Sequence, residues 1–297
     1  MENGPFFCSA VSRDAKEPLF GTVAHIQRWL LIEYPALWHN RAIEESRCLS
    51  GDVKAHLRTL QEHREVDRSL LIRRAHRRSG ALRCFFVDSS CRHSSIRRTV
   101  FSDYDELLSA RERAEDISGL IYAVCTHGRH DKCCAKFGIP VYRALKAIAG
   151  QSVWECSHVG GDRFAGNVVV FPYGLYYGHV QPNEVDEIVS RSERGEVWLK
   201  RYRGRSCFPR AVQIAEHFVR SETGRMGIDD FWPIQSRRMA GNITSVELES
   251  RNDGMRHLLE FETKPEAFKQ LLTCGATEEA AVPKYELRSY KTADARP

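Results

Sequence analysis

The chain has 297 residues, of which 42% are hydrophobic and 28% are charged, and its formal net charge is +5. This length suits two domains, and the balance is typical of a soluble globular protein. No apolar run is long enough to span a membrane, and the first residues lack the apolar core of a secretory signal. We therefore expect no membrane span and a cytoplasmic location.

The densest basic stretches lie at residues 70–80 and 91–98. They flank alternating apolar runs, and we interpret them as the outward faces of strands. The sequence shows no recognisable nucleic-acid-binding module and no interleaved stacking aromatics, so we expect no nucleic-acid partner.

Residues 1–115 are predicted to form an N-terminal α/β domain. Its elements are a strand, a helix capped by Ser50 or Asp52, three strands and a helix that starts at Asp103, at 28–34, 50–63, 69–75, 81–88, 95–102 and 103–113. This order is typical of an α/β sandwich. It is weakly similar to the order in the next domain, so we interpret this unit as a degenerate thioredoxin-like copy.

Residues 116–195 are predicted to form the second domain. Its first elements are a buried strand that runs into a cysteine-rich loop, a helix with Pro140 just inside its start and Gly150 at its end, and a strand, at 118–128, 139–150 and 152–158. A glycine turn, a hairpin and a helix after Pro182 follow, at 159–167, 168–180 and 183–195. The order β-α-β-loop-β-β-α is that of a reduced thioredoxin-like fold.

Residues 196–297 are interpreted as an extension or accessory subdomain. They contain a helix from Pro209 to about Glu222, a hairpin at 243–262 around an Asn-Asp-Gly turn and a further strand at 284–291. The predicted fold class is therefore α/β, with thioredoxin-like sandwich domains and a small α+β C-terminal extension.

Cysteine is abundant, with ten residues in the chain. Three fall in one ten-residue window, and this concentration indicates metal binding or thiol chemistry: Cys125, Cys133 and Cys134. We interpret Cys84 and Cys274 as small apolar residues. We predict no partner for Cys8 or Cys207.

Two segments bring metal-ligand residue types together. Cys125 ends a predicted strand and Cys134 begins a helix, where free backbone N–H groups stabilise a thiolate. His158 and Asp162 stand four residues apart across a Gly-Gly turn. Because both loops open at one edge of a thioredoxin-like sheet, these residues supply the four positions that a binuclear cluster needs.

A resemblance to the sucrase/ferredoxin-like family rests on six segments: VCTHGRHDKCC, VWECSHVGGDRFAGN, VVVFPYGLYYGHV, CSAVSRDAKEPLFGTV, WLLIEYP and RGRSCFPRAVQIAE. It implies a thioredoxin-like ferredoxin domain that transfers electrons through a [2Fe–2S] cluster to a redox partner protein or small-molecule acceptor. In such proteins two cysteines bind one iron and two histidines, spaced H-x-x-x-H, bind the other. Cys125, Cys134 and His158 match the first three ligands, and Asp162 occupies the second histidine position.

That substitution leaves the fourth ligand open. Asp162 is one candidate, and Cys133 or Cys156 would supply a third thiolate instead. Asp162 also suits a helix cap or an ion pair with its neighbour Arg163.

Three further residues are candidates for adjusting the properties of the cluster from positions next to its ligands: His127, His130 and Arg163.

Two other functions compete with electron transfer. A thiol-exchange enzyme is disfavoured, because its active site needs Cys-x-x-Cys and this chain has C-x7-C-C. A structural zinc module would use the same donors. No carboxylate pair indicates a glycosidase, and whether the chain acts as an enzyme or as a carrier is left open.

Overall fold

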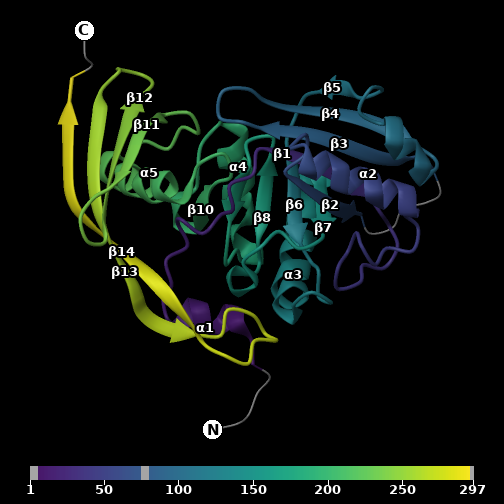
Figure 1. Cartoon of the computed structure of the whole chain (residues 1–297), viewed down its shortest axis with the longest axis horizontal. Helices are drawn as coiled ribbons and strands as arrows, with labels where there is room; N and C mark the ends of the chain where they lie inside the picture. The colour runs from purple at the N-terminus through teal and green to yellow at the C-terminus, as the bar shows by residue number, and fades with distance from the viewer. Residues whose placement is uncertain (1–5, 75–79, 295–297) are drawn as a thin grey trace.

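The computed structural model describes residues 6–74 and 80–294. They form a ten-stranded mixed sheet and a separate four-stranded antiparallel sheet at the C-terminal end (Figure 1). The strand order of the large sheet is β10-β9-β8-β6-β7-β2-β1-β3-β4-β5. The predicted α/β class with a C-terminal extension is confirmed.

The first half of the large sheet is built around β1. Its elements are β1 (Arg28–Glu33), α2 (Gly51–Glu62), β2 (Arg68–Arg73), β3 (Leu82–Ser89) and β4 (Ser94–Phe101). β1 is parallel to β2 and antiparallel to β3, and β3 is antiparallel to β4. Ser50 caps α2, as predicted, by accepting a hydrogen bond from the Val53 N–H. The residues 75–79 of the predicted strand and basic stretch lie outside the described part of the chain.

The helix predicted after Asp103 is a 3₁₀ helix, η1 (Tyr104–Ser109), instead of a longer α-helix. Asp103 and Glu106 form a capping box at its start. The chain then adds β5 (Glu115–Ile117), which pairs with the outer edge of β4. Residues 110–113, the last part of the predicted helix, form a turn instead.

The second half repeats this order. Its elements are β6 (Ile121–Cys125), α3 (Lys132–Ala149), η2 (Gly150–Ser152), β7 (Val153–Cys156), η3 (Asp162–Phe164), β8 (Val168–Phe171), β9 (Leu175–Tyr177), η4 (Pro182–Glu184) and α4 (Val185–Glu193). β6 is parallel to β7 and antiparallel to β8, which pairs with β9. The order β7-β6-β8-β9 is the thioredoxin-like arrangement that the sequence predicts, and β2-β1-β3-β4 has the same form.

Helix α3 begins eight residues before Pro140, so the prediction that Pro140 lies just inside its start was wrong. Asp131 is the cap, and its side chain accepts a hydrogen bond from the Cys133 N–H. Proline inside a helix leaves the carbonyl four residues earlier without a donor. Pro140 and Lys136 are both exposed, so that carbonyl can be solvated and the helix continues.

The two halves join through β2 and β7, which pair antiparallel with Ile72 opposite Cys156. Large side chains from both halves, including Trp29 and Trp154, share one buried core. Because β6 and β7 are parallel, the loops that follow Cys125 and Cys156 open at the same edge of the sheet. The start of β2 lies beside that edge.

The C-terminal region extends the sheet and then leaves it. Its elements are η5 (Leu199–Arg201), β10 (Tyr202–Arg205), α5 (Arg210–Thr223), β11 (Phe231–Arg238), β12 (Ile243–Ser250), β13 (Arg256–Gln270) and β14 (Ala280–Ala293). The predicted helix, hairpin and third strand are confirmed, whereas β10 and β11 were not predicted. The long β13–β14 hairpin runs past the small sheet and reaches helix α1 (Cys8–Asp14) (Figure 1).

A disulfide joins Cys91, in the turn after β3, to Cys207, just before α5. No partner was predicted for Cys207. Among the described helices, none combines the length and the apolar character that crossing a membrane requires.

Candidate metal centre

Two cysteines are held at the end of β6 and the start of α3. Cys125 is the last residue of β6, Cys134 is the third residue of α3, and both side chains are completely buried. Gly138 lets α3 pack directly on the end of β6, because a Cβ at this position would lie 2.0 Å from the Cys125 carbonyl oxygen. The close approach of helix and strand therefore fixes both sulfurs.

The loop after β7 brings His158 and Asp162 to these sulfurs. His158 Nδ1 lies 4.0 Å from Cys125 Sγ and 3.9 Å from Cys134 Sγ. Asp162 Oδ1 lies 3.4 Å from Cys134 Sγ and 3.1 Å from His158 Nδ1. The four residues that the sequence singles out as ligands thus lie together.

The pKa values of the Cys125 and Cys134 thiols are shifted in opposite directions. Hydrogen bonds from Cys134 and from His158 hold the pKa of the Cys125 thiol well below its ordinary value, against the effect of burial. Donation to Cys125, together with burial, raises the pKa of the Cys134 thiol well above its ordinary value. Burial also raises the pKa of Asp162. Of the two thiols in this buried site, Cys125 therefore forms a thiolate more readily than Cys134 does.

Arg68 of β2 holds the first part of the ligand loop. Its guanidinium donates to the His158 carbonyl oxygen at 2.9 Å and to the Val159 carbonyl oxygen at 3.3 Å. The N-terminal half thus contributes directly to the position of His158. Sequence reasoning missed Arg68, since only the β2–β7 pairing brings it to this loop.

Arg203 of β10 holds the glycine turn from the other side. It is 2% exposed and donates to the Gly160 carbonyl oxygen at 3.1 Å and to Asn167 Oδ1 at 2.8 Å. Asn167 in turn donates to the Gly161 carbonyl oxygen. Both glycines have positive φ, which explains why the turn contains them. Arg203 and Asn167 lie in the family-like segments, but the sequence gives no sign of this network.

His127 and His130 lie next to the ligand loop. His127 is buried, and burial lowers its pKa. Its Nε2 is 2.7 Å from the carbonyl oxygen of His39. The exposed ring of His130 stacks on the ring of His158, with centroids 3.9 Å apart.

The other predicted residues face elsewhere. Cys133 Sγ is 3.6 Å from Cys8 Sγ and 3.2 Å from Cys274 Sγ, in a separate group of side chains. Cys156 is fully buried in the core, and burial raises the pKa of its thiol well above the ordinary value. The Arg163 guanidinium forms a 2.6 Å ion pair with Glu17.

A cavity of about 380 Å³ lies beside the site, between the two halves of the large sheet. Its lining includes Arg68, His127, His130 and His158. The side chain of His158 is 16% exposed, whereas both cysteines are sealed. The imidazole is therefore the part of the site that is open to solvent.

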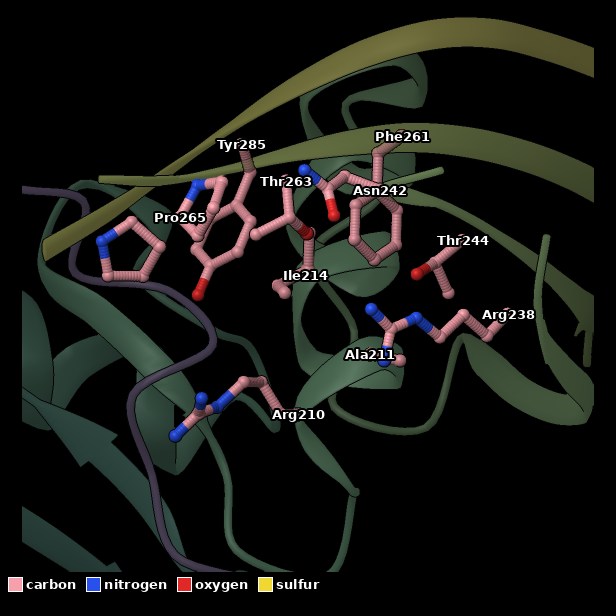
Figure 2. Close-up of a pocket in the computed structure, with 11 residues that line it drawn as sticks. Arg210, Ala211, Ile214, Arg238, Asn242, Thr244, Phe261, Thr263, Pro265 and Tyr285 are labelled. Carbon is pink, nitrogen blue, oxygen red and sulfur yellow. The ribbon is translucent and has the colours of Figure 1, made fainter. Parts of the chain in front are cut away.

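Figure 2 shows a second cavity, of about 460 Å³, between α5 and the C-terminal sheet. Arg210, Arg238 and Tyr285 are among the residues that line it. None of the four candidate ligands lines this cavity, so it is separate from the candidate metal centre.

The donor set suits a metal. Thiolate and imidazole are ligand types found at both iron–sulfur and zinc centres, and zinc also accepts a carboxylate. Within the described residues, the donor atoms of Cys125, Cys134 and His158 all lie within 4.8 Å of one another, and so do those of His130, His158 and Asp162.

Known proteins resemble parts of this chain. It is 32% identical over 101 residues to Altered inheritance of mitochondria protein 32 from Meyerozyma guilliermondii, a match covering 30% of this chain and 36% of the relative. The protein of the same name from Debaryomyces hansenii is 33% identical over 103 residues, covering 31% and 38%. The match thus spans little more than a third of the length of either relative.

Among solved structures, a thioredoxin-like [2Fe-2S] ferredoxin from Aquifex aeolicus is 24% identical, with a TM-score of 0.28; the match covers 31% of this chain and 97% of the ferredoxin. The wild-type crystal structure of such a ferredoxin at 1.5 Å resolution gives 23% identity and a TM-score of 0.26, covering 29% and 97%. Residues 19–204, more than half of the chain, match the sucrase/ferredoxin-like family. This protein belongs to the sucrase/ferredoxin-like family.

Proposed function

We propose that this chain is an electron-transfer protein that holds a [2Fe–2S] cluster through Cys125, Cys134, His158 and Asp162. The observation that supports this most directly is the convergence of two buried thiols, an imidazole and a carboxylate at one sheet edge. Membership of a ferredoxin-like family agrees with it. A cluster bound there would accept and release one electron.

Each residue has a distinct part in this proposal. Cys125 and Cys134 would bind one iron, and His158 and Asp162 the other. Asp162 would replace a neutral imidazole by an anion, which opposes the addition of an electron and lowers the reduction potential. The burial of both cysteines keeps water from the sulfur side.

Electrons would enter and leave on the His158 side. Only this ligand faces the 380 Å³ cavity, and the His130 ring is stacked on it. We propose that a redox partner protein or a small-molecule acceptor docks at this cavity. Arg68 would keep the His158 backbone in place when a partner binds and leaves.

We also propose a division of labour along the chain. Residues 116–195 would be the ferredoxin domain, and residues 1–115 a degenerate thioredoxin-like copy, because the two halves have the same strand order. Where Cys125 ends β6, Glu33 ends β1. The first copy would therefore support the ligand loop through Arg68 without ligands of its own, and residues 196–297 would be an accessory extension.

A second candidate is a structural zinc site built from the same side chains. The donor atoms of Cys125, Cys134 and His158 are close enough together for a single tetrahedral ion. A thiol-exchange enzyme fits less well, because neither cysteine is exposed and a nucleophilic thiolate needs access.

Anaerobic purification from iron-supplied cells distinguishes these functions. We expect a red-brown protein with about two irons and two acid-labile sulfides per chain, and an EPR signal after reduction. Cys125→Ser and Cys134→Ser should lose the colour, whereas Cys84→Ser and Cys274→Ser should keep it. A colourless protein with zinc but without sulfide would overturn the proposal.

A further inference from the structure

Three cysteines from distant parts of the chain meet at the N-terminus of α3, in a group separate from Cys125 and Cys134. Cys8 begins α1, Cys133 is the second residue of α3, and Cys274 lies in the loop between β13 and β14. Their sulfurs are 3.2 Å apart for Cys133 and Cys274, and 3.6 Å apart for each of the other two pairs. All three are free thiols.

Asp131 completes this group. Its Oδ1 accepts a hydrogen bond from the Cys133 N–H at 2.8 Å, and its Oδ2 accepts one from the Cys274 N–H at 2.6 Å. The same Oδ2 lies 4.0 Å from Cys8 Sγ. Cys8 and Cys133 have no exposed surface, and Asp131 is 5% exposed. A carboxylate is thus held in a buried position beside three sulfurs, with lone pairs to spare.

The spacing suits a tetrahedral ion better than a disulfide. A disulfide bond is about 2.05 Å long, so the 3.2 Å between Cys133 and Cys274 is a contact between unbonded sulfurs. A Zn–S bond of about 2.3 Å places two sulfurs on a tetrahedral zinc about 3.8 Å apart. To bind one ion, Cys133 and Cys274 need to separate their sulfurs by about 0.6 Å and the other two pairs by about 0.2 Å, which a small side-chain rotation can supply.

We propose that Cys8, Cys133, Cys274 and Asp131 form a structural Zn²⁺ site. Zinc favours thiolate ligands and accepts a carboxylate oxygen in tetrahedral sites. Binding forms three Zn–S bonds and one Zn–O bond and releases the three thiol protons to solvent, without any redox change. Four protein ligands in a buried site leave no open position, which is the arrangement of a structural and not a catalytic zinc.

The site would clamp three segments together. The β13–β14 hairpin already contacts the segment that follows α1, because Gln270 donates a hydrogen bond to Glu17. The zinc would fasten the tip of this hairpin and the first residue of α1 to the start of α3. Cys133 and Cys134 are neighbours in α3, yet their sulfurs belong to different groups. The zinc site therefore shares no ligand with the proposed cluster.

Metal analysis of the full-length chain tests the proposal. The protein is purified anaerobically from cells supplied with both iron and zinc, dialysed against a weak chelator and analysed for both metals. We expect about one zinc per chain in addition to the iron. Cys8→Ser and Cys274→Ser should each reduce the zinc at least tenfold and leave the iron and the visible spectrum unchanged. Cys125→Ser should do the reverse, and Cys48→Ser, which removes an exposed thiol, should change neither.

Cobalt gives a second measurement that does not depend on the cluster. In the Cys125→Ser protein, Co²⁺ added in place of zinc should show the thiolate-to-metal and d–d bands of a tetrahedral site, and Cys274→Ser in that background should abolish them. Two results overturn the proposal. One is a wild-type chain without zinc, with or without a Cys133–Cys274 disulfide. The other is zinc that is lost in Cys125→Ser and retained in Cys274→Ser, since that ion would occupy the candidate cluster site.

Discussion

The backbone N–H of His158 donates a hydrogen bond to Nδ1 of His127 across 3.3 Å. The other ring nitrogen of His127, Nε2, faces the His39 carbonyl oxygen and therefore carries the proton. Both nitrogens of His127 are thus engaged with backbone, and neither is available to a metal. His127 positions the His158 backbone, while His158 presents its own Nδ1 to the two sulfurs.

His127→Phe should keep the bound iron but weaken the site. The substitution removes the hydrogen bonds of the His158 N–H and the His39 carbonyl to this ring, and each such hydrogen bond contributes about 1 kcal/mol. We expect a lower urea midpoint and a shifted EPR signal. His127→Asn, whose side-chain oxygen can accept from the His158 N–H, should recover part of both. Complete loss of iron in His127→Phe, as in Cys125→Ser, would instead make His127 a ligand.

Asp162 is the position where the chain departs from the H-x-x-x-H pattern. If it is a ligand, Asp162→Ala should lose or strongly destabilise the cluster. Asp162→His should keep the cluster at a more positive potential, because a neutral imidazole opposes an added electron less than a carboxylate does. Redox titration followed by visible absorption measures this. The exposed Asp14→Ala is the control. An unchanged spectrum in Asp162→Ala would mean that the fourth ligand lies elsewhere.

Gly138→Ala should be far more damaging than an ordinary glycine-to-alanine change. Alanine normally favours a helix over glycine by about 1 kcal/mol. Here the added Cβ would lie 2.0 Å from the Cys125 carbonyl oxygen, so α3 must move away from β6. We expect a clear loss of thermal stability and of bound iron.

Gly51→Ala at the start of α2 is the matched control, because a Cβ there meets nothing within 4 Å. Its melting temperature should equal or exceed that of the parent protein. If Gly138→Ala behaves in the same way, the packing of α3 against Cys125 does not fix the sulfur positions.

The sequence predicted many of the elements well, because local signals mark them. The Ser50 cap, the β8–β9 hairpin and the turn between β12 and β13 each depend on residues a few positions apart. The start of α3 was misplaced because Pro140 outweighed the Asp131 cap. Strand β11 was missed because most of its side chains are exposed and show no alternating apolar pattern.

Contacts between distant segments were beyond sequence reasoning. Arg68 reaches the His158 loop only because β2 pairs with β7. Cys274 lies 141 residues from Cys133 and meets it through the β13–β14 hairpin. The interpretation of Cys274 as a small apolar residue rested on its local surroundings, which carry no trace of this contact. The choice of Cys125, Cys134, His158 and Asp162 as ligands stays a prediction until metal is measured.

His179 provides a pH-dependent test of how α1 packs on the second half of the large sheet. Its ring is 3% exposed and contacts the hydroxyls of Ser9 and Ser12, each at 3.4 Å. Burial, with a further contribution from the charge of Arg13, lowers the pKa of His179 to about 3. Between pH 6.5 and this value the unfolded chain binds a proton that the folded chain does not.

The contribution of His179 to the free energy of unfolding should therefore be fully present above about pH 6.5 and be lost as the pH falls. The loss is at most about 1.4 kcal/mol per pH unit. Between pH 6.5 and pH 5 its share amounts to about 2 kcal/mol. His179→Gln removes the titrating group, so urea unfolding of this variant should depend less steeply on pH over that interval. His25→Gln, at an exposed histidine, should follow the parent protein. Equal slopes for His179→Gln and the parent would show that His179 gains its proton in the folded state as readily as in the unfolded chain, and that α1 does not seal it from water.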